Sequence, residues 1–255
     1  MKNSEIFYFD VDGTILDNDL QKISDKTINA LNKLQANGYK IALATGRTIA
    51  ALNTPAIQTV CDWDAYVLGN GGSILDKDLN VIKEHLCEPE FIHNLIKLYP
   101  GPIILEVNKN YVIGEMTETL KDFLGEVGDA IEVIEQYNNE PVLKVIIEDF
   151  ELIEGGYSNP IFNDYDYFIN TGLMPEVFPK NSGKHLGIAE LNEILGVKRH
   201  TYFGDGNNDV DSIRTADFGV AMGNGVQAAK DVADYVTSSV SEDGVANALR
   251  HFKLI

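Results

Sequence analysis

The chain has 255 residues, 44% of them hydrophobic and 23% charged, a composition typical of a globular protein with one large domain or two smaller ones. Its formal net charge of −19 argues against nucleic acid and anionic membrane surfaces as partners, and no apolar stretch is long enough to span a bilayer. Because no signal-peptide pattern precedes the first predicted strand, and the two cysteines have no metal-type or redox-type spacing, we expect a soluble, cytoplasmic protein.

The first 82 residues alternate short buried strands with helices. Ser24 is a candidate N-cap, and Gly38 is placed to end the helix that begins there, whereas Pro55 should interrupt or kink the next helix. In chain order, the predicted elements are strand 5–10, helix 24–38, strand 39–45, helix 47–60 and strand 65–70. This order predicts a parallel, right-handed, doubly wound sheet.

Residues 83–178 follow a different pattern, which we interpret as an inserted α+β segment with its own small sheet. Its first two strands meet at Lys109-Asn110, which predicts a hairpin and antiparallel pairing. The elements predicted within the insert are strands 102–108, 111–115, 141–149 and 164–170 and a helix at 117–127. The insert contains 19 acidic residues against five lysines and no arginine, which favours a well-solvated acidic surface.

The first pattern returns after the insert. The predicted elements are helix 182–195, strand 200–205, helix 208–215, strand 218–222, helix 224–233, strand 234–237 and helix 242–252. We therefore predict an α/β fold with a doubly wound parallel (Rossmann-like) sheet core. Residues 1–82 and 179–255 form this core, and residues 83–178 form an inserted α+β domain.

Polar residues gather where three predicted parallel strands end, at the edge of the sheet where ligands bind in open α/β folds. The segments are DVDGT at 10–14, TGR at 45–47 and GDGNND at 204–209, and Lys184 lies near the start of the helix that precedes the last of these strands. Carboxylates crowded into a cleft either take up protons or bind a cation. Oxygen ligands without His or Cys favour a hard ion, so we expect Mg²⁺, and its charge together with Lys184 would suit a phosphoryl group.

In this order, the segments resemble the four motifs of the haloacid dehalogenase-like phosphohydrolases, and the insert together with GNGG at 69–72 resembles the Cof-type subgroup. The resemblance implies a phosphatase of a small phosphorylated metabolite, with the insert as a cap that contacts the leaving group. It implies that Asp10 is the nucleophile that forms an aspartyl-phosphate, and that Asp12 is the general acid and then the general base. The carboxylates of Asp10 and Asp205 and the backbone carbonyl of Asp12 would hold the metal ion.

The same resemblance implies supporting roles around the phosphoryl group. The groups expected to hold phosphate oxygens are the Thr45 side chain, the amides of Val11 and Gly46, and Asn208. Lys184 would stabilise charge on the transferring group, and Asp209 would support Lys184 or a metal-bound water. Arg47 is expected to be structural and to pair with an acid near the edge of the sheet.

Several positions keep a second interpretation. Thr45 suits a buried strand as a β-branched residue, and Asn208 and Asp209 are good N-caps for the helix that follows them. Lys180 lies four residues before Lys184 in PKNSGKHLG and is a rival for the motif lysine.

The lack of arginine in residues 83–178 removes one kind of clamp for a second phosphate or a carboxylate. We therefore expect a monophosphate with a neutral or cationic leaving group, such as a sugar phosphate or pyridoxal phosphate. A phosphotransferase or phosphomutase would use the same intermediate, and a phospho-binding or signalling protein would share the acidic cluster and the lysine. Asp12 favours an enzyme, because a phospho-switch does better without a general base beside its phosphorylated aspartate. The sequence leaves the oligomeric state open.

Overall fold

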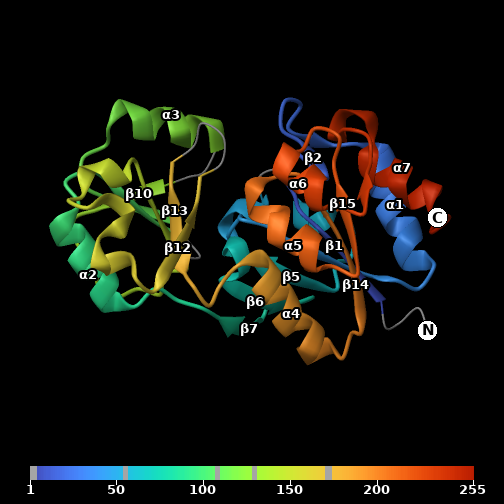
Figure 1. The fold of residues 1–255 in the computed structure, drawn as a ribbon, viewed down its shortest axis with the longest axis horizontal. Helices are drawn as coiled ribbons and strands as arrows, with labels where there is room; N and C mark the ends of the chain where they lie inside the picture. The colour runs from blue at the N-terminus through green and yellow to red at the C-terminus, as the bar shows by residue number, and fades with distance from the viewer. Residues whose placement is uncertain (1–4, 54–56, 107–109, 128–130, 170–173) are drawn as a thin grey trace.

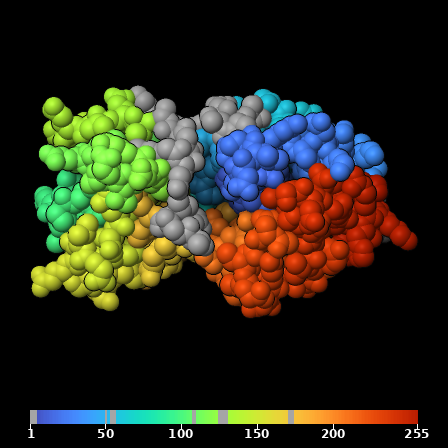
Figure 2. Space-filling view, turned by 90° about the horizontal axis from the view of Figure 1, so that it is seen from above, coloured from blue at the N-terminus to red at the C-terminus, as the bar shows by residue number. Residues whose placement is uncertain are grey.

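The structure is a computed structural model, and it describes all residues except 1–4, 54–56, 107–109, 128–130 and 170–173. Figure 1 shows two lobes, and Figure 2 shows the same lobes from above. One lobe contains an eight-stranded sheet built from both ends of the chain, and the other contains a six-stranded sheet built from its middle. Among the described residues, no helix combines the length and the apolar character that crossing a membrane requires.

The eight-stranded sheet has the order β16-β15-β14-β1-β4-β5-β6-β7. Its strands are β1 (Glu5–Phe9), β4 (Lys40–Ala44), β5 (Ala65–Leu68), β6 (Ser73–Asp76), β7 (Val81–Glu84), β14 (Arg199–Gly204), β15 (Phe218–Ala221) and β16 (Tyr235–Val236). The six strands from β16 to β5 run parallel, which confirms the predicted doubly wound sheet. The antiparallel strands β6 and β7 extend one edge and were not predicted.

Strand β1 lies inside this sheet and is buried on both faces. Phe7 and Phe9 pack in the hydrophobic cluster that includes helices α1 (Asp25–Ala36) and α7 (Gly244–His251). Ile6 and Tyr8 pack in the opposite cluster, which includes residues of α4 (Lys184–Leu195), α5 (Val210–Thr215) and α6 (Gln227–Val232). A parallel sheet covered by helices on both faces needs apolar side chains in both directions, which explains the continuous apolar run of this strand.

The helix caps follow the predictions, but one predicted helix is wrong. The Ser24 side chain accepts a hydrogen bond from the Thr27 amide at the start of α1, and Gly38 follows the end of α1 with a positive φ of 88°. In place of the helix predicted over 47–60, the structure has two short 3-10 helices, η2 (Ala50–Asn53) and η3 (Ile57–Thr59). Pro55 lies outside the described residues, but a proline has no amide hydrogen and disfavours helical geometry in the residue before it.

The six-stranded sheet of the insert has the order β10-β9-β8-β11-β13-β12. Its strands are β8 (Ile103–Glu106), β9 (Asn110–Ile113), β10 (Ile131–Ile134), β11 (Lys144–Ile147), β12 (Tyr165–Phe168) and β13 (Glu176–Pro179). Helix α2 (Pro89–Leu98) packs in the cluster on one face, and α3 (Glu118–Val127) packs in the cluster on the other. Strands β8 and β9 are antiparallel as predicted; Asn110 belongs to β9, and Lys109 lies outside the described residues.

The remaining elements are short. They are the paired strands β2 (Leu16–Asp17) and β3 (Lys22–Ile23) and the 3-10 helices η4 (Gly69–Gly71), η5 (Phe150–Leu152), η6 (Gly156–Ser158), η7 (Pro160–Phe162), η8 (Asn207–Asp209) and η9 (Val240–Glu242). The two predicted joins between core and insert fall within β7 and at the last residue of β13. The division of the chain at these joins stays a prediction.

Candidate active site at the ends of the parallel strands

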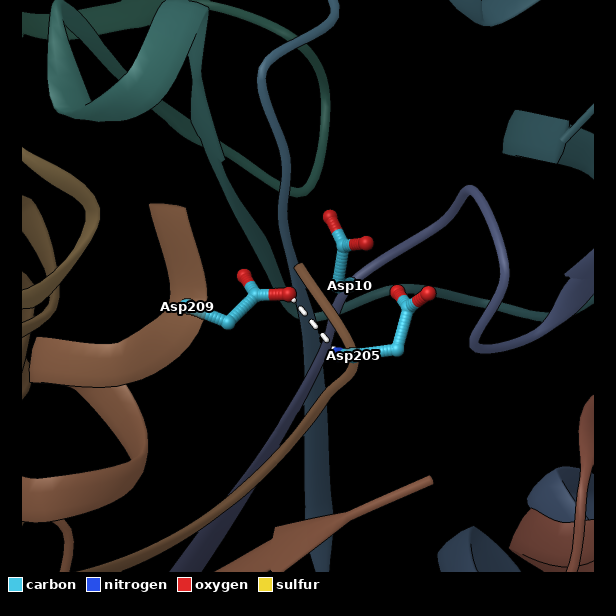
Figure 3. A group of neighbouring side chains, drawn as sticks. All are labelled: Asp10, Asp205 and Asp209. Atoms are coloured by element: carbon cyan, nitrogen blue, oxygen red, sulfur yellow. Dashed lines mark hydrogen bonds between the residues drawn. The ribbon is translucent and has the colours of Figure 1, made fainter. Parts of the chain in front are cut away.

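Three aspartates from separate segments meet at the carboxyl end of the central strands. Asp10 directly follows β1, and its amide donates to the Phe203 carbonyl of β14, so the two strand ends are held side by side. Asp205 directly follows β14, and Asp209 lies four residues later in η8. One carboxylate oxygen from each aspartate lies within 4.8 Å of the others, and Figure 3 shows the three side chains as neighbours. Parallel topology therefore assembles this acidic group.

Lys184 is the cation at the centre of the group. Its side chain is buried, and its Nζ donates to Oδ1 of Asp10 and to Oδ1 of Asp209, both at 2.6 Å. Burial alone would lower the pKa of Lys184, but the carboxylates of Asp10 and Asp209 raise it above the ordinary value, so the ammonium stays charged. Lys180, the rival for the motif lysine, is exposed and donates to the Asn163 carbonyl instead.

The approach of helix α4 to the sheet depends on glycine. Lys184 is the first residue of α4, and Gly183 before it packs against Gly71 of the loop after β5. A Cβ at position 71 would lie 2.2 Å from the Gly183 carbonyl oxygen, and Gly71 has a φ of 90°. Any larger residue at position 71 would push α4, and Lys184 with it, away from Asp10.

Both carboxylate oxygens of Asp209 accept hydrogen bonds from other groups of the protein. Its Oδ1 accepts from Lys184 and from the Tyr202 hydroxyl at 2.6 Å, and its Oδ2 accepts from the amides of Asp205 at 2.9 Å and Gly206 at 2.8 Å. The bond to the Asp205 amide is the dashed line in Figure 3. With both oxygens taken, Asp209 is suited to hold Lys184 and the loop after β14 rather than to bind a metal ion.

Asp205 and Asp10 carry negative charge that the protein offsets only in part. Asp205 accepts from the Thr14 hydroxyl and from the Asn224 side chain, both at 3.2 Å. Burial and the nearby Asp209 raise the pKa of Asp205 to about 7, although Lys184 acts in the opposite direction. Burial and Asp209 likewise raise the pKa of Asp10 well above its ordinary value.

A divalent cation fits this arrangement. The raised pKa values of Asp10 and Asp205 show that the site favours added positive charge, and the available donors are oxygen atoms. Asp10 and Asp205 are the members of the group whose carboxylates are suited to bind it. Gly13 leaves room for Asp205, since a Cβ there would lie 2.3 Å from Oδ2 of Asp205.

Asp12 and Arg47 form a bidentate ion pair in the same cavity. Arg47 Nε lies 2.9 Å from Oδ2 of Asp12, and Nη2 lies 2.7 Å from Oδ1. Nη1 of Arg47 donates to the Ala51 carbonyl at 2.9 Å, so η2 holds the guanidinium. The acid partner expected for Arg47 is thus Asp12 itself, and both Asp12 oxygens are engaged.

The predicted phosphate-binding residues lie in different surroundings. Thr45, Gly46 and Asn208 line the cavity; the Thr45 hydroxyl accepts from the Arg47 amide, and the Asn208 side chain donates to Oδ1 of Asn70 at 3.0 Å. The Val11 side chain is buried in the hydrophobic cluster, and its carbonyl accepts from three following amides. The role of the Val11 amide stays a prediction.

A cavity of about 690 Å³ lies between the two lobes. Asp10, Asp12 and Asp205 line it from the eight-stranded sheet. The insert contributes one face of its sheet and part of α3. A cavity of this size accommodates a small metabolite.

Three site residues were not predicted from the sequence. In the sequence, Tyr202 has the features of an ordinary strand residue. Its hydroxyl contact with Asp209 depends on the turn after β14, which the sequence did not show. Asn224 lies in GNG at 223–225, and Asn70 lies in GNGG at 69–72, so a short glycine-flanked asparagine was the available signal. Asn70 is buried and has a positive φ of 55°, a backbone conformation in which asparagine is enriched.

Comparison with known proteins agrees with this geometry. The chain matches the family model of haloacid dehalogenase-like hydrolases over residues 7–249. It is 31% identical to the 5-amino-6-(5-phospho-D-ribitylamino)uracil phosphatase YcsE of Bacillus subtilis (strain 168), over 98% of this chain and 96% of that protein. The HAD subclass IIB sugar phosphatase BT4131 has a similar structure, with a TM-score of 0.87, 28% identity, and coverage of 98% of this chain and 100% of that one. BT1666 from Bacteroides thetaiotaomicron gives a TM-score of 0.87 and 26% identity, covering 98% of this chain and 96% of its own.

Proposed function

The chain belongs to the haloacid dehalogenase-like hydrolase family and is a phosphomonoesterase of that type, and from this premise we propose that it hydrolyses a small phosphorylated metabolite in a magnesium-dependent reaction. In this reaction Asp10 carries the phosphoryl group as an aspartyl-phosphate. The convergence of Asp10, Lys184 and Asp205 at the base of the cavity is the observation that supports the proposal most directly.

In the first step, a carboxylate oxygen of Asp10 attacks phosphorus, and the bond from phosphorus to the leaving oxygen breaks. Asp12 gives its proton to that leaving oxygen. Because both oxygens of Asp12 are bound by Arg47, at least one of these contacts must open before Asp12 transfers a proton. Lys184 supplies positive charge beside Asp10 as charge develops on the transferring group.

In the second step, water attacks the phosphorus of the aspartyl-phosphate. Asp12, now deprotonated, accepts a proton from that water, the bond from Asp10 to phosphorus breaks, and inorganic phosphate leaves. Thr45, the Gly46 amide, the Val11 amide and Asn208 are the proposed contacts to the phosphate oxygens. Magnesium bound by the carboxylates of Asp10 and Asp205 and by the Asp12 carbonyl would neutralise charge between nucleophile and phosphate.

We propose that residues 1–82 and 179–255 act as the catalytic core and residues 83–178 as a cap. The support is that side chains of both segments line the cavity that Asp10, Asp12 and Asp205 also line. Closure of a cap over such a site would keep bulk water away during the first step and bring the leaving group to Asp12. A cytoplasmic location remains our expectation for this enzyme.

Release of inorganic phosphate from a panel of phosphomonoesters with MgCl₂ tests the proposal. The panel includes sugar phosphates and 5-amino-6-(5-phospho-D-ribitylamino)uracil, because relatives are phosphatases of these kinds. We expect turnover without any acceptor, loss of turnover with EDTA, and a loss of at least ~10³-fold in kcat for Asp10→Asn. Asp78→Asn, an exposed aspartate paired with Lys77, is the matched control and should behave like the wild type.

Two results would contradict the proposal. Near-wild-type phosphate release by Asp10→Asn would exclude Asp10 as the nucleophile. An unchanged rate of phosphate release in EDTA would exclude a role for the metal ion in the reaction. Phosphate transfer that requires a sugar acceptor would instead identify a phosphotransferase with the same intermediate. Mass spectrometry of Asp12→Ala after mixing with substrate adds a direct readout, because this variant should accumulate phosphorylated protein.

A further inference from the structure

A second polar cluster lies on the insert, on the face of its sheet that lines the cavity. It consists of Glu106 on β8, Lys144 on β11 and Glu176 on β13, which we call the insert triad. These three strands are neighbours in the order β8-β11-β13. Lys144 stands directly opposite Glu106, and Glu176 pairs with Ile146, two residues along β11, so the register places the three side chains on one face.

The triad residues are joined by short ion pairs and are largely buried. Lys144 is 3% exposed, and its Nζ lies 2.9 Å from Oε2 of Glu106 and 2.5 Å from Oε2 of Glu176. Burial lowers the pKa of Lys144, but the two carboxylates raise it more, so the ammonium stays charged at neutral pH. With two carboxylates and one ammonium, the formal charge of the triad is −1.

The fold of the insert gives no reason for such a cluster. The opposite face of the same sheet packs α2 with apolar side chains, including Leu105, Val145 and Val177, which precede or follow the triad residues along the strands. Buried ion pairs of this kind contribute little to stability compared with apolar residues of similar volume, because desolvation offsets their attraction. A charged triad that lies only on the cavity face is therefore better explained by contact with a ligand in the cavity than by a contribution to stability.

Beyond the triad, this face carries the buried Asn110 on β9, opposite Glu106, and several apolar side chains. Ile104 and Ile146 extend from the same strands as the triad, and Phe123 and Ile131 line the cavity beside them. The triad also connects to the catalytic side, because the Asn70 side chain donates to Oε2 of Glu176 at 3.0 Å and accepts from Asn208 at 3.0 Å. The triad and these apolar side chains thus line the part of the cavity that the insert contributes.

We propose that the insert triad is the leaving-group subsite, in which Glu106 and Glu176 accept hydrogen bonds from hydroxyl or amino groups and Lys144 holds the two carboxylates in place. This inference rests on the proposed function and specifies its substrate class. The enzyme takes monophosphates whose leaving group is a neutral or cationic polyol or amino compound with an apolar side or face. A second phosphate or a carboxylate there would meet the two carboxylates and one ammonium of the triad, and none of residues 83–178 is an arginine that could clamp it.

A matched series of six-carbon phosphates tests the inference. Glucosamine 6-phosphate has a cationic leaving group, glucose 6-phosphate has a neutral one, and 6-phosphogluconate has an anionic one. We expect kcat/KM for the first two to exceed that for 6-phosphogluconate by at least ~10-fold. The double variant E106Q/E176Q changes the triad charge from −1 to +1, and it should shift this ratio at least ~10-fold toward 6-phosphogluconate.

The control carries the same charge change elsewhere on the insert. E90Q/E151Q replaces two exposed glutamates outside the cavity, and its substrate ratio should stay within about twofold of the wild type. We compare the ratio of kcat/KM values for two substrates, because a loss of active protein lowers both values equally and cancels in the ratio. Circular dichroism checks that each variant is folded. If the double variant is unfolded, E176Q alone changes the charge by one unit and should shift the ratio at least ~3-fold.

The outcomes separate the subsite from the catalytic proposal. Equal shifts in E106Q/E176Q and E90Q/E151Q, or a wild type that prefers 6-phosphogluconate, would overturn the subsite while Asp10-dependent hydrolysis still stands. A wild-type enzyme that releases no phosphate from these three compounds, from p-nitrophenyl phosphate or from any other phosphomonoester of the panel would overturn both.

Discussion

Asparagine substitution of Asp205 and Asp209 separates metal binding from support of the lysine, although the two residues belong to one acidic group. Asp209→Asn removes one of the two carboxylate partners of the buried Lys184. The new amide has one oxygen, which cannot accept from Lys184 and Tyr202 while also accepting from the two backbone amides. Breaking a buried ion pair costs about 3–5 kcal/mol, which corresponds to a fall of about 6–20 °C in Tm for a chain of this size. We expect kcat to fall too, because Lys184 loses one of its two anchors.

Asp205→Asn should have the opposite effect on the metal-free protein. The pKa of Asp205 is raised to about 7, so keeping its carboxylate charged near pH 8 costs on the order of 4 kcal/mol relative to an ordinary aspartate. The neutral amide avoids this cost, so metal-free Asp205→Asn should unfold at or above the Tm of the metal-free wild type. Magnesium should then raise the Tm of the wild type and of Asp209→Asn, but not that of Asp205→Asn.

Calorimetric unfolding near pH 8 with EDTA or with saturating MgCl₂ measures both effects. Asp211→Asn, which removes an exposed carboxylate of α5, is the control for loss of one negative charge nearby. Our reasoning would be refuted if Asp209→Asn lost the magnesium-induced rise in Tm while Asp205→Asn kept it. It would also be refuted if metal-free Asp205→Asn were much less stable than the wild type.

Further predictions follow from individual contacts. In EDTA, the free energy of unfolding should fall as pH rises from about 4 through about 7, because folded Asp205 retains a proton that the unfolded chain releases, and urea denaturation across this range with and without MgCl₂ measures the slope. Asn70→Ala should cost about 1–3 kcal/mol in urea denaturation and raise KM more than it lowers kcat, because its side chain joins the two lobes. Gly13→Ala should reduce kcat at least ~10-fold and weaken magnesium binding measured by calorimetry, since position 13 has a φ of 76° and its Cβ would strike Asp205. Ser24→Ala should lower Tm by about 2–4 °C through loss of the α1 N-cap, with kcat/KM unchanged.

The core could be predicted from sequence because its signals are local. Short apolar runs ending in Asp10, Thr45 and Asp205 predict buried strands with polar ends, and parallel topology requires those ends to share one edge of the sheet. The caps Ser24 and Gly38 likewise act on neighbouring backbone groups and need no tertiary information.

The parts that were not predicted depend on contacts between distant segments. Tyr202 lies in an ordinary strand sequence, and GNGG at 69–72 does not show what Asn70 contacts. The roles of both residues arise from hydrogen bonds to residues of other elements. The helix predicted over 47–60 fails because an apolar period alone does not outweigh a proline in its middle. Lys144 appears in the sequence as a single lysine in an apolar strand, and only the register of β11 against β8 and β13 shows that it is paired with two glutamates.

The charges of the cavity also decide how a substrate lies within it. On the catalytic side, four carboxylates face Lys184 and Arg47, and this excess of negative charge requires a cation before a phosphate dianion can approach. On the insert side, the triad carries its own lysine, needs no metal ion, and stays net negative. A phosphomonoester would therefore find attraction for its dianion beside Lys184 and the proposed magnesium ion, and its leaving group would be directed toward the insert. The same difference in charge between the two sides of the cavity would therefore both attract the substrate and orient it. Removing magnesium should abolish substrate binding as well as the chemical step.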